Sequence, residues 1–121
     1  MVKFEIKKKT KREYFKIILE LFFLNVNKEV SNRHLEFLVE CILLVHKGYK
    51  EPLSTSNKKR IARMMNIKPS NLYTIISNCR AEGLIPKQGE TIGKTFEDIA
   101  NLKLDELDYL IKIKFEEVSN D

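Results

Sequence analysis

The chain has 121 residues, 43% of them hydrophobic, and a formal net charge of +5 at pH 7. This length suits one compact domain, and the hydrophobic content supports a buried core, which excludes a disordered chain or a disulfide scaffold. No apolar run reaches the ~20 residues of a membrane span, and the charged N-terminus does not have the pattern of a signal peptide. We therefore expect a cytoplasmic protein with no membrane partner.

The positive charge is concentrated in part of the chain. Residues 47–94 carry ten Lys/Arg and three acidic residues, whereas residues 95–121 carry three Lys/Arg and eight acidic residues. This asymmetry is expected when one face of a protein meets phosphate groups. An ordinary solvated Lys-rich surface would have the same composition, so charge alone does not decide between the two.

The N-terminal part predicts a strand, a basic segment and two helices. In residues 1–10, Val2, Phe4 and Ile6 alternate with charged residues, which is typical of a half-buried strand. The lysines and arginine between Lys7 and Arg12 are either a DNA-contacting arm or a solvated linker.

Residues 11–47 show the periodicity of two helices. The first is apolar on almost every side over residues 14–24, which makes that stretch the candidate interface of a homo-oligomer. Ser31 is the expected N-cap of the second helix, and Gly48 follows its C-terminal end.

Residues 53–85 have the spacing of a helix-turn-helix. Ala62 is small enough for a close crossing of two helices, and Asn66 tolerates the left-handed backbone of a tight turn. Pro69 suits the first position of the second helix, predicted over residues 69–82, and Gly83 suits its end.

The remaining elements are expected to include β-structure. Residues 53–92 would form one unit in which a short wing over residues 86–92 follows the helix-turn-helix. Residues 95–121 predict a short helix and a C-terminal strand, which we expect to pair with the strand near the N-terminus because each has an unsatisfied edge. The expected fold is thus mainly α with a small β component, in a single domain spanning residues 1–121.

The helix-turn-helix segment resembles the winged helix-turn-helix superfamily, which includes bacterial and phage regulators of the MarR-like type. The resemblance covers about half of the chain and is carried by Ile61, Ala62, Met65, Ile67, Leu72, Ile76, Cys79, Gly83, Leu84 and Ile85. Cys79 stands where the family usually has Leu, and the short wing lacks the Asp-Arg signature of MarR proteins. The resemblance implies a winged-helix fold more firmly than it implies an activity.

Two sets of residues are the candidate contacts to double-stranded DNA. Short polar and aromatic side chains on the outward face of the second helix would read base edges; they are Ser70, Asn71, Tyr73, Thr74 and Ser77. Basic residues on the first helix, the turn and the wing would bind phosphates; they are Lys58, Lys59, Arg60, Arg63, Lys68 and Lys87.

The sequence gives no support for catalysis, a metal or a cofactor. His34 and His46 are twelve residues apart on one predicted helix, and no nucleophile motif or phosphate-binding loop is present. Cys41 and Cys79 are expected to be buried thiols and not a disulfide.

Two functions remain as alternatives. The first is a homodimeric transcriptional regulator that inserts helix 69–82 into the major groove. The second is a phage structural, virion-assembly or DNA-packaging adaptor, in the host cytoplasm or the virion, that uses the winged helix to bind protein. The Lys-, Asn- and Ile-rich composition and the two terminal strands favour the second interpretation.

Overall fold

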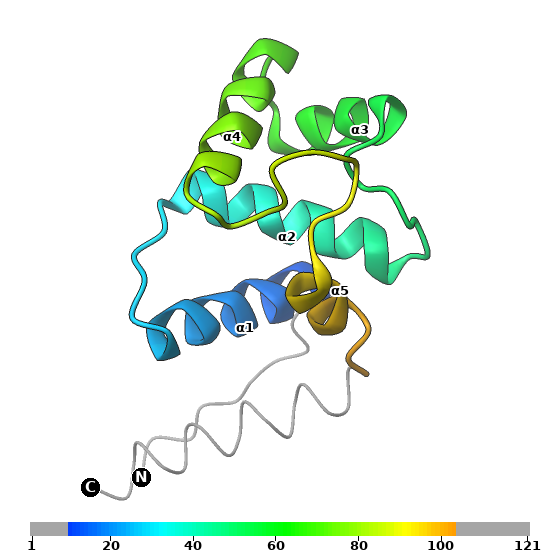
Figure 1. The fold of residues 1–121 in the computed structure, drawn as a ribbon. Helices are drawn as coiled ribbons and strands as arrows, with labels where there is room; N and C mark the ends of the chain where they lie inside the picture. Colours follow the sequence, from blue (N-terminus) through cyan, green and yellow to red (C-terminus); the bar gives the residue numbers. More distant parts are fainter. Residues whose placement is uncertain (1–9, 104–121) are drawn as a thin grey trace, which may run out of the picture.

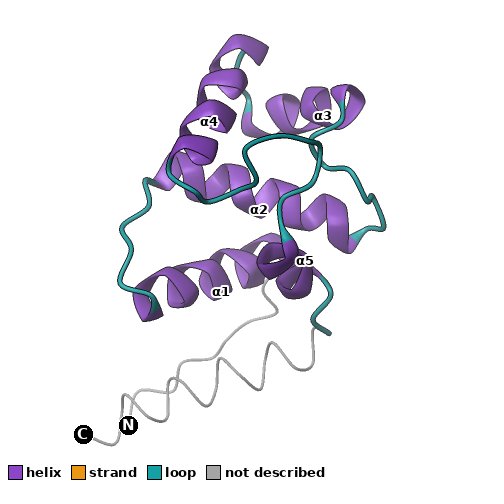
Figure 2. Ribbon diagram, in the orientation of Figure 1, coloured by secondary structure: helices purple, strands orange, loops and turns teal. Residues whose placement is uncertain are grey.

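The computed structural model describes residues 10–103, which form five helices joined by loops (Figures 1 and 2). The helices are α1 (Lys11–Asn25), α2 (Asn32–His46), α3 (Thr55–Met65), α4 (Pro69–Ala81) and α5 (Lys94–Ala100).

Short-range signals in the sequence define where the helices begin. The hydroxyls of Thr10, Ser31 and Ser54 accept hydrogen bonds from backbone N–H groups in the first turns of α1, α2 and α3, respectively. Such caps satisfy donors that have no partner inside the helix, so Ser31 acts as the sequence predicts. Pro69 occupies the first turn of α4, where its lack of an N–H has no cost.

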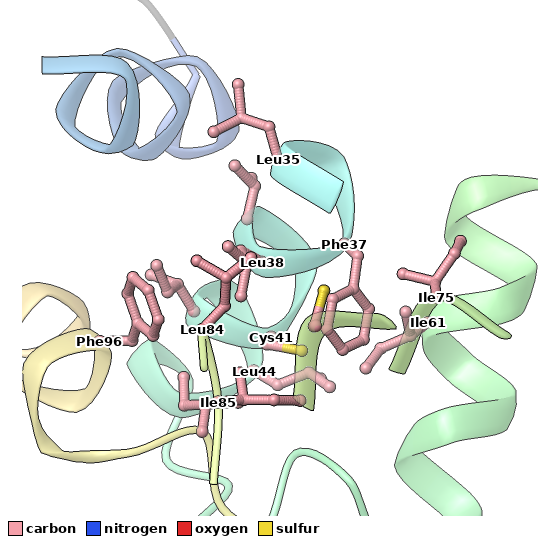
Figure 3. Close-up of a cluster of buried hydrophobic side chains, with 14 of the residues drawn as sticks. Leu35, Phe37, Leu38, Cys41, Leu44, Ile61, Ile75, Leu84, Ile85 and Phe96 are labelled. Atoms are coloured by element: carbon pink, nitrogen blue, oxygen red, sulfur yellow. The ribbon is translucent and has the colours of Figure 1, made fainter. Parts of the chain in front are cut away.

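Helix α2 is the centre of the core and packs against each of the other four helices. Its residues from Phe37 to Leu44 are all buried, and Figure 3 shows several of them meeting side chains from α3, α4, α5 and the loop after α4. Cys41 lies among them as a free, fully buried thiol. Burial on all sides is what an almost continuous apolar stretch in a helix predicts.

Helix α1 leaves less apolar surface exposed than an interface over all of residues 14–24 would need. Phe15, Leu19 and Phe23 are buried, and further apolar residues of α1 pack against the same core. Arg12 fixes the start of this helix on α2 through a two-pronged ion pair, in which Nε donates to Glu40 Oε1 at 2.6 Å and Nη2 donates to Oε2 at 3.2 Å. The apolar surface left for a partner is therefore only part of residues 14–24.

Helix α5 closes the core on the side opposite to α4 (Figure 1). The Nδ1–H of His46, at the end of α2, donates to the carbonyl of Ala100 at 2.8 Å, and its ring meets Phe15 edge-on. Phe96 is buried against Phe22 and Phe23 of α1. The expected short helix near residue 95 is thus present and ties α1 to α2.

The prediction of a wing is wrong, because no strand occurs anywhere between residues 10 and 103. Residues 86–92 form an irregular loop, held to the segment before α3 by one backbone hydrogen bond, from Leu53 N to Glu90 O at 2.9 Å. Ile85 and Ile92 are buried at the two ends of this loop, and residues 87–91 are exposed. Because apolar and polar residues do not alternate between Ile85 and Ile92, this segment has no apolar face on which a hairpin could pack.

The structure therefore corrects the winged-helix fold class to an all-helical arrangement over the described residues. The two expected terminal strands and their pairing lie outside residues 10–103. Within the described residues, no helix combines the length and the apolar character that crossing a membrane requires.

Candidate nucleic-acid interface

A tight turn of three residues joins α3 to α4. Asn66 adopts the left-handed conformation, with φ 55° and ψ 48°, and the N–H of Ile67 donates to the carbonyl of Ala62 at 3.0 Å. Ala62 and Ile61 are buried against the core, and Ile67 packs on it from the turn. The turn that residues 53–85 predict is present, and it leaves one face of each helix exposed.

The exposed face of α4 contains all five candidate base-contacting residues. Leu72, Ile75, Ile76 and Cys79 are buried, and Ser70, Asn71, Tyr73, Thr74 and Ser77 are exposed. The five do not point the same way, however. At about 100° per residue, Asn71 and Tyr73 lie about 160° apart around the helix, so they flank Ser70, Thr74 and Ser77 on opposite edges.

The edge of α4 that carries Tyr73 borders an open groove of about 520 Å³, here called the α4 groove. The groove lies between α4, the first turns of α3 and the loop after α4, and its lining combines four of the predicted contacts with one further cation. The lining residues are Lys58, Tyr73, Ile76, Ser77, Arg80, Ala81 and Lys87.

Cations dominate the electrostatics of the α4 groove. Three of its lining residues are cationic and none is acidic. The Lys58 ammonium lies 5.0 Å from the centre of the Tyr73 ring, a cation–π contact between α3 and α4. Since the groove contains three cations and no carboxylate among its lining residues, it attracts anions.

A second hollow, of about 670 Å³, lies on the outer face of α3 and is here called the α3 hollow. It is lined by Thr55, Ser56, Lys59, Arg60 and Arg63, again without a carboxylate. The hollow includes the N-terminal turn of α3, where the helix dipole is positive. Arg60 is oriented by Tyr49, whose hydroxyl accepts from Nη1 at 2.6 Å and whose ring lies 5.1 Å from the guanidinium.

The predicted phosphate contacts therefore fall into two groups and one separate residue. Lys58 and Lys87 share the α4 groove, and Lys59, Arg60 and Arg63 share the α3 hollow. Lys68 is exposed at the N-cap of α4 and lines neither. Within the described chain the structure thus joins residues that are up to 29 positions apart, from Lys58 to Lys87, at one site.

Arg80 is the residue that sequence reasoning missed. Its Nη2 donates to the carbonyl of Gly89 at 2.8 Å, which links α4 to the loop that replaces the wing. Its Nε–H is buried and has no hydrogen-bond acceptor among the described residues. Arg80 follows Tyr73 by seven residues and Ser77 by three, so helical spacing alone would have placed it on their edge of α4.

The metal-ligating and thiol side chains within residues 10–103 do not form a second site of these kinds. No group of three or more His, Cys, Asp or Glu side chains is arranged there to hold a metal ion. Burial raises the pKa of the Cys79 thiol to about 12 and that of the Cys41 thiol well above its usual range, so both thiols stay protonated at neutral pH.

The α4 groove and the α3 hollow are accordingly the sites that geometry and charge single out in the described chain. Comparison of the chain with models of protein families, with curated proteins and with solved structures finds no match.

Proposed function

We propose that this protein binds double-stranded DNA, with α4 in the major groove and α3 against the backbone. The observation that supports the proposal is the cationic α4 groove, which borders the exposed polar face of α4, together with the second cationic hollow on the outer face of α3. Major-groove readers present short hydrogen-bonding side chains on one helix and neutralise phosphates with cations around it. A wing is not part of this proposal, since helix α4 and the tight turn are sufficient to expose the polar face.

The outward centre of α4 suits modest sequence readout. Ser70, Thr74 and Ser77 are hydroxyl side chains that can donate to or accept from base edges. The Thr74 hydroxyl donates to the Ser70 carbonyl at 3.3 Å, which leaves its oxygen free to accept a hydrogen bond. Asn71 can pair with adenine through two hydrogen bonds, whereas Arg80 lies at the edge of this face and is bonded to the Gly89 carbonyl in the α4 groove. We therefore propose a preference for A·T base pairs.

A role in transcription regulation would require a dimer, because two copies of α4 must match two half-sites about one helical turn of DNA apart. Part of α1 remains the candidate interface. Leu24 is 77% exposed and Val26 is 49% exposed at its C-terminal end, next to the half-buried Leu21. A protein that is a monomer at micromolar concentration by analytical ultracentrifugation would contradict the regulator but not DNA binding itself.

The decisive experiment is selection of binding sites from a randomised duplex pool, at 50 mM and at 150 mM salt. The expected result is a reproducible A·T-rich motif that Asn71→Ala weakens or broadens. Asn78→Ala is a matched control, since Asn78 is also an exposed amide of α4 but lies about two turns farther toward its C-terminal end. Recovery of no motif, with affinity that disappears at the higher salt, would contradict sequence-specific binding.

The same experiment separates the alternative function in virion assembly or DNA packaging. A module that binds protein would retain no duplex at 150 mM salt, and substitutions of Ser70 or Asn71 would leave its assembly unchanged. The exposed apolar residues Leu24 and Val26 favour a protein partner of some kind, and a second copy of this chain is the simplest one.

A further inference from the structure

Arg80 lines the α4 groove and is anchored there by a hydrogen bond to the loop after α4. Its Nη2–H donates to the Gly89 carbonyl, and its Nε–H is enclosed without an acceptor in the described chain. A guanidinium with one enclosed N–H unpaired and no carboxylate among its groove neighbours is electrostatically unsatisfied. Since Arg80 lines the groove, an anion bound there would balance the charge of its guanidinium.

The other polar groups of the groove match the same kind of anion. Lys58 and Lys87 supply ammonium groups, and the hydroxyls of Tyr73 and Ser77 supply neutral donors. Three cations with hydroxyl donors suit a phosphate group, which has several oxygens that each accept hydrogen bonds. A carboxylate ligand would use fewer of these donors, because it has only two oxygens.

We infer that the α4 groove is an oxyanion site for a single phosphate group, with Arg80 as its central cation. This inference rests on the proposed function for the source of the phosphate, which would be a backbone phosphodiester of the DNA beside α4. Arg80 also has a positioning role, because its bond to Gly89 holds the loop that carries Lys87 next to the groove. A free phosphate compound has the same chemistry and would compete with DNA for the groove.

The first test needs no DNA. Pyrophosphate is titrated into the full chain at constant ionic strength, while ¹H–¹⁵N spectra follow the Arg80 Nε–H and calorimetry gives the affinity. We expect the Arg80 signal to shift, and Arg80→Gln to weaken binding at least tenfold. Lys103→Gln is the control, since it removes one positive charge from an exposed residue that lines neither hollow, and it should change the affinity less than twofold.

Arg80→Gln also removes the hydrogen bond to the Gly89 carbonyl, so a second variant that keeps this bond serves as a control. Lys87→Gln removes a groove cation from an exposed loop residue, and it should weaken pyrophosphate binding about threefold or more. Equal effects of Lys103→Gln, Arg80→Gln and Lys87→Gln would overturn the inference, because binding would then reflect diffuse charge only. No shift of the Arg80 signal at millimolar pyrophosphate would overturn it as well.

The second test uses a 20-base-pair duplex and separates this inference from the proposed function. Arg80→Gln should reduce the magnitude of the salt slope of DNA binding by about one, the value for one lost phosphate contact. Duplex binding with no change of the Arg80 signal would overturn the oxyanion site and leave DNA binding intact. Pyrophosphate binding without duplex binding would retain the oxyanion site, assign a free phosphate compound to it, and overturn the proposed function.

Discussion

The dependence of DNA affinity on salt is the prediction that the structure defines best. The α4 groove contributes three cations, Lys58, Arg80 and Lys87, and the α3 hollow contributes Lys59, Arg60 and Arg63. Each neutralised phosphate of B-DNA releases about 0.9 counter-ion, so six contacts give a slope of about −5 for log affinity against log salt. A rise from 50 to 200 mM salt should then lower the affinity about a thousandfold.

Fluorescence anisotropy with a labelled 20-base-pair duplex at five or six KCl concentrations measures this slope. Lys59→Gln and Arg63→Gln should each reduce its magnitude by about one. The control is Lys103→Gln, because Lys103 is exposed, follows α5 in the chain and lines neither hollow, and the substitution should leave the slope unchanged. A wild-type slope shallower than about −2, or equal effects of the three substitutions, would refute the assignment of these cations to phosphates.

Three further predictions concern the fold around the site. Asn66→Ala should lower the free energy of unfolding by about 1–2 kcal/mol in urea titrations, because Asn66 is left-handed, and Asn66→Gly should cost less. Neither Cys41 nor Cys79 should be alkylated by iodoacetamide in the folded protein at pH 8, since burial raises both thiol pKa values; mass spectrometry should find both modified in urea. The hydrogen bond and negative charge of Glu90 raise the pKa of Glu51, so Glu51 stabilises the fold at pH values below its unfolded pKa and loses that contribution as pH rises through the folded pKa. Glu51→Ala should therefore lower the melting temperature at pH 4 and not at pH 7.

The helices around the site were predictable because their signals are local. Ser31 caps α2, Pro69 begins α4 and Asn66 turns the chain between α3 and α4, and each depends on neighbours within about one turn of helix. The apolar spacing of α4 likewise predicts its buried face, since Leu72, Ile76 and Cys79 recur every three or four residues.

The wing was not predictable in this way, because a hairpin depends on pairing between segments. The expectation came from a family resemblance in which strands flank the recognition helix, and residues 86–92 have no alternation of their own. Gly89 and Gly93 both have positive φ, and a β-carbon on Gly93 would lie 3.5 Å from Pro86 Cδ. Pro86 also lacks the N–H that a strand would use. This loop is therefore shaped by local backbone constraints and buried ends, and not by a ladder of hydrogen bonds.

The types of residue at the site were predictable from the sequence, but their division between the α4 groove and the α3 hollow was not. Charge density along the chain indicates that residues 58–68 and Lys87 are basic, and it does not indicate which of them meet. Lys58 and Lys87 line the same groove although they are far apart in sequence. The adjacent Lys59 lines the α3 hollow instead, because successive residues of a helix point about 100° apart. Arg80 was overlooked because its neighbours in sequence, Cys79 and Ala81, contribute no charge, and its partner Gly89 is in a loop.

An irregular loop in place of a wing is still able to present Lys87 in a defined position. Three features restrain it: the Leu53 to Glu90 backbone hydrogen bond, the Arg80 to Gly89 hydrogen bond, and the burial of Ile92. Each lies within five residues of Lys87, so the exposed part of the loop between the anchors is short. Ordering a lysine on such a loop costs less conformational entropy on binding than ordering one on a free segment. In the proposed DNA complex, Lys87 would thus contact a phosphate from a tethered loop, and Arg80 is the residue that links this loop to α4.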